Sequence, residues 1–249
     1  MKQFLASLLF CGPLIATEII APASTQLLAG TEFFPAINLT NGSGLTQIPT
    51  ISNYRTTTHA AASGSTAWTT DAPGGGAADY FALSQASAPL PVFLLTFAKE
   101  HDFTDFIYWG YHFGNPNGNE AKSFTLEFST DRGSTFPDSI SLNAPAISLG
   151  NATTLPLDAS YPANTIRLTL TDNWFENFGG GDRAGLGEIR FLGTTPIDPA
   201  PVIDVPPLVD FHLASQALLG RNLENRRRRR SRHQNPRHGL RLRLDPLLS

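Results

Sequence analysis

After an apolar beginning, the chain consists largely of short stretches in which apolar and polar residues alternate. A period of two places successive side chains on opposite faces of an extended backbone, so that one face packs and the other meets water. Helical periodicity is hard to find, and the run 106–111 is rich in aromatic residues. The alternating runs are 92–97, 123–130, 165–171 and 186–192, with expected inward residues Phe93, Leu95, Phe97, Phe124, Leu126, Phe128, Ile166, Leu168, Leu170, Ile189 and Phe191. The pattern predicts an all-β chain.

Turn-forming sequences separate these runs. The segment 131–134, DRGS, is typical of a tight turn, and 114–119 and 179–182 are rich in Gly with Asn or Asp. Several short strands punctuated in this way indicate a β-sandwich or a β-barrel. The stretch 46–88 is long, weakly patterned and rich in small residues, which is typical of a functional loop or of one packed against the body.

The N-terminus has the order of features found in a secretory signal peptide. Lys2 precedes an apolar stretch that ends at Ala16 and is too short to span a bilayer. We assign residues 1–23 to the signal, with cleavage after Ala16 or after Ala23; the alternative is a buried N-terminal strand. The only cysteine, Cys11, falls within it, which excludes disulfides and thiol catalysis from the mature chain. The protein is therefore expected to be secreted or on the cell surface.

The net charge of −3 hides two regions of opposite sign. Up to residue 214 there are 8 Lys/Arg and 19 Asp/Glu, a net charge of −11, whereas residues 215–249 hold 10 Arg and 2 acids, a net charge of +8. We therefore predict a domain at 24–193, a Pro-rich linker at 194–214 and an Arg-rich, disordered tail at 215–249. No run of about 18 apolar residues occurs, so no transmembrane helix is expected.

Five segments together resemble discoidin-like domains, which are also described as coagulation factor type-C-like or galactose-binding-like. The segment 121–131, AKSFTLEFSTD, resembles a strand of that family and the turn that follows it. The resemblance covers about residues 24–193, and the segments, in the family's order, are 34–42, 106–110, 121–131, 166–173 and 185–191. It implies a jelly-roll β-sandwich of about eight strands, with ligands bound in loops at one end.

The resemblance also implies a structural calcium ion between the opening loop and an acid near the last strand. The matching residues are Asn38, Asn41, Gly42 and Glu188. Calcium takes about six to eight oxygen ligands, which carbonyl groups and one or two carboxylates supply. Asn41 stands where the family usually has Asp, and the missing charge is expected to weaken the site. The alternative is an Asn-Gly turn beside a surface acid.

Three loops carry aromatic, charged and amide side chains of the kind that bind sugars through ring faces and hydrogen bonds. One of them holds Tyr111 and Phe113. The candidate ligand-binding residues are Arg55, His112, Trp174 and Arg183. The alternative for Arg183 is a bracing contact within its glycine-rich loop. Two other tryptophans, Trp68 and Trp109, are expected to be buried instead.

Catalytic motifs are absent from the sequence. It has no G-x-S-x-G motif and no His-x-x-x-His or Cys-x-x-Cys pair, and the run 74–76 lacks the lysine of a phosphate-binding loop. The spacing of acid pairs such as Asp102/Asp105 and Glu176/Asp182 gives no support to glycosidase chemistry. We therefore predict a non-catalytic exported domain that recognises carbohydrate or an extracellular polymer. The alternatives are a structural surface or matrix protein with no small ligand and, less favoured, a glycan hydrolase.

The order of signal, domain, linker and Arg cluster also resembles bacterial PEP-CTERM surface proteins, which end in a Pro-Glu-Pro motif, an apolar helix and a few arginines. Here Pro-Ala-Pro at 199–201 stands in place of the motif, and no apolar helix follows. The tail is then a polyanion-binding patch, a retention charge without its helix, or the product of a shifted reading frame. We favour the shifted frame, which predicts an apolar helix in another frame of the gene, and expect no specific nucleic-acid partner.

Overall fold

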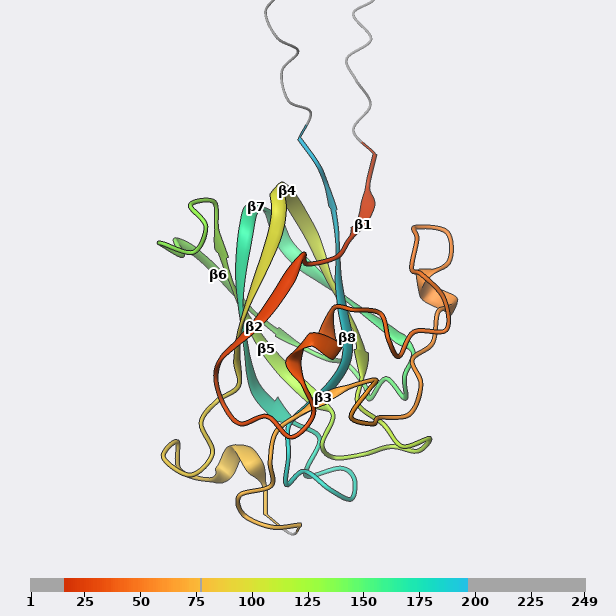
Figure 1. Ribbon diagram of the computed structural model, residues 1–249, viewed down its shortest axis with the longest axis vertical. Helices are drawn as coiled ribbons and strands as arrows, with labels where there is room; N and C mark the ends of the chain where they lie inside the picture. The colour runs from red at the N-terminus through yellow and green to blue at the C-terminus, as the bar shows by residue number, and fades with distance from the viewer. Residues whose placement is uncertain (1–15, 77, 197–249) are drawn as a thin grey trace, which may run out of the picture. The chain divides into compact units, whose positions relative to one another are not determined.

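The computed structural model describes residues 16–76 and 78–196, and β-strands dominate it (Figure 1). The strands are β1 (Glu18–Ile20), β2 (Ser24–Ala29), β3 (Trp68–Thr69), β4 (Val92–Gly110), β5 (Ala121–Ser129), β6 (Asp138–Asn143), β7 (Ala152–Asn173) and β8 (Gly185–Thr194). Three short 3-10 helices lie in the connections: η1 (Ala36–Leu39), η2 (Tyr54–Thr56) and η3 (Tyr80–Ala82). The predicted all-β class with about eight strands is confirmed.

Two long strands, β4 and β7, run through both layers of a β-sandwich. The first part of β4 (92–96) pairs with β2 and with residues 165–169 of β7. The second part of β4 (102–109) pairs with β8 and with residues 152–162 of β7. One layer therefore has the strand order β2-β4-β7-β5-β6. In the other layer, β8 pairs with β1 and β3 along one edge and with β4 along the other, and β7 follows β4. All these pairs are antiparallel, and the predicted jelly-roll β-sandwich is confirmed.

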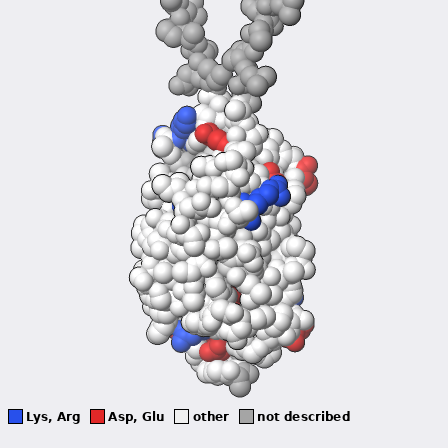
Figure 2. All heavy atoms as spheres, turned by 90° about the vertical axis from the view of Figure 1, so that its right-hand side faces the viewer, with Lys and Arg blue, Asp and Glu red and all other residues white. Residues whose placement is uncertain are grey.

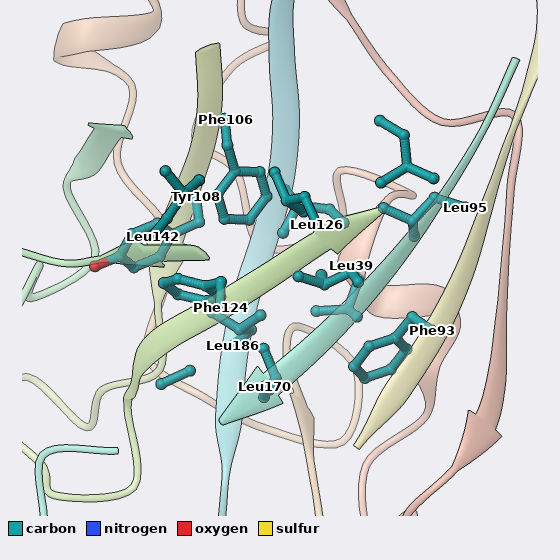
Figure 3. Packing of buried hydrophobic residues seen from close by; sticks show 14 of the residues in the cluster. Leu39, Phe93, Leu95, Phe106, Tyr108, Phe124, Leu126, Leu142, Leu170 and Leu186 are labelled. Carbon is teal, nitrogen blue, oxygen red and sulfur yellow. The ribbon is translucent and has the colours of Figure 1, made fainter. Parts of the chain in front are cut away.

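Aromatic side chains from the two layers meet in the core (Figure 3). The ring centroid of Phe106, in the second part of β4, lies 5.2 Å from that of Phe124 in β5. Trp68 of β3 meets Phe93 of β4 edge-on, with ring centroids 4.7 Å apart. All the inward residues expected from the alternating runs are buried, which confirms the period-two interpretation. Burial of each such side chain contributes about 1.5–3 kcal/mol to the hydrophobic driving force.

Part of the weakly patterned stretch 46–88 covers the outer face of the layer that contains β8. Trp109 packs there in a small second cluster with Tyr54, Ile107 and Leu192. The indole N–H of Trp109 donates to the carbonyl oxygen of Thr57 at 2.8 Å, which ties the stretch to β4. Trp68 and Trp109 are both 0% exposed, so their predicted burial is confirmed.

β1 lies in the segment that the sequence assigns to the signal. It pairs antiparallel with the end of β8, and Ile20 belongs to the core with 5% exposure. Of the two expected cleavage positions, the one after Ala16 keeps β1 and the one after Ala23 removes it. The rest of the predicted signal (1–15), the tail and most of the linker lie outside the described residues. Among the described residues, no helix is long and apolar enough to cross a membrane.

Gly150 is required by both its backbone angle and its neighbours. Its φ is +76°, and a Cβ would lie 2.3 Å from Nε2 of His112 and 2.8 Å from the carbonyl oxygen of His59. Gly150→Ala should therefore lower the free energy of unfolding by about 2–4 kcal/mol in urea denaturation. Gly75, with a φ of +74° and open space around it, gives the matched control. Gly75→Ala should cost only about 1 kcal/mol, and equal losses would contradict the steric argument.

Candidate functional site

Several loops gather at the end of the sandwich where β8 begins (Figure 1). The loop 174–184 leads directly into Gly185, the first residue of β8. β4 ends at Gly110, opposite Leu186, so the loop 111–120 starts at the same end. β1 pairs with the other end of β8. The loop end is therefore opposite the point where the N-terminal strand joins the sheet.

Two buried asparagines fix the glycine-rich loop 174–184. The side-chain oxygen of Asn119 accepts the backbone N–H groups of Gly181 at 2.5 Å and Arg183 at 3.1 Å. The side-chain nitrogen of Asn173 donates to the carbonyl oxygens of the same two residues, each at 2.9 Å. Because buried polar groups that are hydrogen-bonded to a loop rigidify it, the backbone of Arg183 is held in one position.

Two pairs of side chains at this end, Phe33 with Arg183 and Tyr111 with Phe113, are grouped as the aromatic–arginine patch, since the Arg183 charge also acts on the Tyr111 hydroxyl. Phe33 and Phe113 are large apolar residues that remain 54% and 51% exposed. The Arg183 guanidinium carbon lies 4.3 Å from the ring centroid of Phe33. Tyr111 meets Phe113 edge-on, with centroids 5.2 Å apart. Exposed aromatic rings beside a fixed cation are typical of a binding surface.

Polar groups in the patch keep hydrogen-bonding capacity. One terminal nitrogen of Arg183, Nη1, donates to the carbonyl oxygen of Thr70 at 2.6 Å. Its other guanidinium N–H groups have no hydrogen-bond partner within the described part of the chain. Burial raises the pKa of the Tyr111 hydroxyl, against the smaller opposing effects of the Arg183 charge and the Thr69 side chain. The tyrosine therefore stays neutral at physiological pH.

The structure separates the four predicted ligand-binding residues, and only Arg183 lies in the patch. His112 is buried, with Nε2 3.0 Å from the carbonyl oxygen of His59, while its Nδ1 accepts the Gly114 N–H. The ring thus braces two loops. Arg55 is exposed and lies outside the patch, in η2 on the outer face of the layer that contains β8. Its guanidinium carbon lies 5.0 Å from the Tyr54 ring centroid.

Trp174, the remaining predicted ligand residue, belongs to a neighbouring group on the same loop. The Lys122 ammonium lies 5.5 Å from its ring centroid and forms an ion pair with Asp172 at 2.9 Å. Phe178 packs edge-on at 6.4 Å. The indole nitrogen is buried and has no hydrogen-bond partner among the described residues. This half-buried ring is therefore largely engaged within the protein.

Phe33 was missed by the sequence reasoning, although a signal was present. Phe33 and Phe34 are adjacent in a short loop before Pro35. In extended backbone, neighbouring side chains point to opposite sides, so two successive phenylalanines outside a buried strand leave one exposed. The sequence placed Phe113 in a candidate loop, but only the structure shows that its side chain is 51% exposed.

The four residues predicted to bind calcium do lie together. The Gly42 N–H donates to Oε2 of Glu188 at 2.9 Å. The side-chain nitrogen of Asn38 donates to the carbonyl oxygens of Ala67 at 2.8 Å and Gly64 at 3.1 Å. The Asn41 side chain accepts from the Ser43 N–H at 2.8 Å. The opening loop is thus joined to β8 by the Gly42–Glu188 hydrogen bond of the chain itself.

Arg190, which the sequence reasoning did not consider, pairs with Glu188. Its Nη1 donates to Oε1 of Glu188 and to the carbonyl oxygen of Ile189. Burial raises the pKa of the Glu188 carboxyl, and Arg190 and the Gly42 N–H oppose this rise. A cavity of about 260 Å³ adjoins Arg190, with lining residues that also include Asn41, Gly42 and Gln47.

These surroundings do not fit a calcium ion. Calcium requires several oxygen atoms directed at one point, whereas a guanidinium and a backbone N–H are directed at the Glu188 carboxylate. Elsewhere among the described residues, no group of three or more His, Cys, Asp or Glu side chains is placed to hold a metal.

No protein-family model matches the chain, and no curated protein matches it. Several solved structures are similar to the chain. A family 32 CBM from Clostridium perfringens in complex with galactose is 12% identical, with a TM-score of 0.43 over 71% of this chain and 99% of that chain. A second C. perfringens module, in complex with GalNAc-β-1,3-galactose, is 16% identical, with a TM-score of 0.38 over 71% and 94%. A Streptococcus pneumoniae fucose binding module is 13% identical, with a TM-score of 0.39 over 69% and 92%.

Proposed function

We propose that the protein is a non-catalytic carbohydrate-binding domain and that it acts outside the cell, on a glycan or an exopolysaccharide. The observation that carries the proposal is the aromatic–arginine patch, in which a half-exposed Phe33 lies beside a fixed Arg183 and a half-exposed Phe113 packs on Tyr111. A pyranose ring presents a C–H face that packs on an aromatic ring and hydroxyl groups that accept from a guanidinium. The patch supplies both kinds of contact within one small surface.

The charge distribution favours a neutral ligand. On the face drawn in Figure 2, charged side chains are few and of both signs, without a large field of either. Arg183 is the one cation in the patch, and one of its terminal nitrogens is bonded to the Thr70 carbonyl oxygen. A polyanion would require several such cations to release its counterions.

The expected affinity for a single sugar is low. A hexose has about 12 non-hydrogen atoms, and about −0.3 kcal/mol per atom corresponds to a Kd in the millimolar range. Binding must therefore be sought with millimolar sugar or with multivalent glycans, whose linked sites raise the apparent affinity.

A glycan array followed by NMR titration tests the proposal on the full chain. Galactose, GalNAc and fucose are the first sugars to titrate. Phe113→Ala and Arg183→Ala should each weaken binding about 5- to 30-fold, because each removes a ring or charge contact of about 1–2 kcal/mol. Circular dichroism should show that both variants remain folded, since both side chains are partly or largely exposed.

Arg55→Ala is the matched control, because it removes an exposed arginine that also stacks on an aromatic ring but lies outside the patch. It should leave affinity unchanged. Loss of binding in Arg55→Ala with normal binding in Phe113→Ala would place the ligand elsewhere. No binding to any glycan would favour a structural surface protein with no small ligand.

A further inference from the structure

The ion pair between Glu188 and Arg190 is buried on the outer face of β8. Residues two apart in a strand point to the same face, and these two lie opposite Trp109 and Ile107 of β4 in the sheet register. The Glu188 side chain is 0% exposed and that of Arg190 is 8% exposed. A carboxylate without a counter-charge at such a depth would be strongly destabilising.

Every carboxylate oxygen of Glu188 already accepts a hydrogen bond. Arg190 donates to Oε1, and the Gly42 N–H donates to Oε2. The side-chain oxygens of Asn38 and Asn41 also accept, from the Asn41 amide at 3.4 Å and from Ser43 N–H at 2.8 Å. Each of these four side-chain oxygens therefore already accepts from an N–H group of the chain.

We propose that Arg190 is a built-in cation that takes the place of calcium in joining the opening loop to β8. The guanidinium neutralises Glu188, and the same carboxylate then receives the Gly42 N–H from the loop. The carbonyl oxygen of Ile189 holds the guanidinium at 2.6 Å. An always-protonated arginine provides this charge at any calcium concentration. The domain folds without calcium, and its stability is independent of it.

Arg190 is then the residue that excludes calcium. The cavity of about 260 Å³ is lined by Arg190 and by Asn41 and Gly42 of the loop. Removing the guanidinium would leave space next to the Glu188 carboxylate, which Arg190 now contacts, on the side of the Asn41 loop. Asn41→Asp would then add the second carboxylate that calcium sites commonly use.

Thermal unfolding of the full chain tests the proposal first without any variant. The midpoint should be the same in EDTA and in about 10 mM calcium, a concentration above the Kd of extracellular calcium modules. A midpoint that rises and saturates with calcium, or that falls in EDTA, would overturn the proposal.

Two variants extend the test. Arg190→Gln should lower the midpoint by about 10 °C, because it leaves Glu188 buried without its counter-charge. In Asn41→Asp/Arg190→Gln, calcium should recover part of the decrease in midpoint, and magnesium should not.

Arg167→Gln is the control, since its pair with Glu127 is partly exposed and its loss should shift the midpoint by only a few degrees. Equal small shifts for Arg190→Gln and Arg167→Gln would also refute the role of Arg190.

Discussion

Trp68→Ala should lower the free energy of unfolding by about 3–5 kcal/mol, which is close to the total stability of many single domains. Trp68 is 0% exposed and meets Phe93 across the two layers at 4.7 Å. It also lies on β3, which is only two residues long and pairs with the start of β8. Few backbone hydrogen bonds hold β3, so its position depends on the packing of this side chain. Urea denaturation followed by circular dichroism measures the loss.

Trp68→Phe separates packing from hydrogen bonding at the same position. The indole nitrogen of Trp68 is buried and has no partner among the described residues. Replacing it with a phenyl ring removes an unsatisfied polar group, which offsets part of the lost packing. The cost should therefore stay below about 1.5 kcal/mol. A loss as large as that of Trp68→Ala would contradict this interpretation of the indole nitrogen.

Glu120→Gln should become more stabilising relative to the wild type as the pH rises. Glu120 is 0% exposed, and its Oε1 accepts the Ser148 N–H at 2.8 Å. Its Oε2 is buried and without a partner among the described residues. Burial raises the pKa of this carboxyl to about 8, although the hydrogen bonds to Ser148 and Leu149 oppose the rise.

The direction in which stability changes with pH follows from proton binding to Glu120. Between the ordinary pKa of 4.5 and about 8, the folded state keeps a proton on Glu120 that the unfolded state has lost. Stability therefore falls as the pH rises through this interval, by roughly 3–4 kcal/mol between pH 5 and pH 9. Glutamine does not titrate, so the variant lacks this loss.

The measurement is the difference in unfolding free energy between variant and wild type at pH 5 and pH 9. Other titrating groups are common to both proteins and cancel. Asp131→Asn is the control, because hydrogen bonds to Ser129 and Thr135 lower the pKa of Asp131 to about 2. Its difference from wild type should be flat over the same range. A flat difference for Glu120→Gln would mean that water or another group solvates the carboxyl.

The sequence predicted the core better than it predicted the strands. Alternation identified Phe93, Leu95 and Phe97 correctly, because burial on one face of a strand imposes a period of two. It suggested separate strands at 92–97 and 106–111, whereas β4 is one strand of 19 residues. The polar residues between these runs lie where β4 passes from one layer to the other, so the alternation is interrupted although the strand is not.

The site was less predictable, because one sequence does not reveal which way a loop side chain points. His112 was a reasonable candidate by type, but hydrogen bonds to His59 and Gly114 direct its ring inward. The convergence of Gly42 with Glu188 was expected from the family resemblance and is found as a hydrogen bond. The role of Arg190 depends on its facing Glu188 within a buried face of β8, and nothing in a local pattern distinguishes that from a solvent-exposed pair.

The position of β8 also constrains the order in which the domain can fold. β8 is the last described strand along the chain, yet it lies inside its layer, with β4 on one side and β1 and β3 on the other. A hydrogen bond between Thr195 and Glu18 closes this layer across 177 residues of sequence. Contacts so distant in sequence slow folding, since long loops must be closed before the contacts form. Until β8 arrives, β1 and β3 have no strand to pair with and the aromatic face of β4 is uncovered. A chain halted before β8 would therefore be an aggregation-prone intermediate rather than a smaller domain.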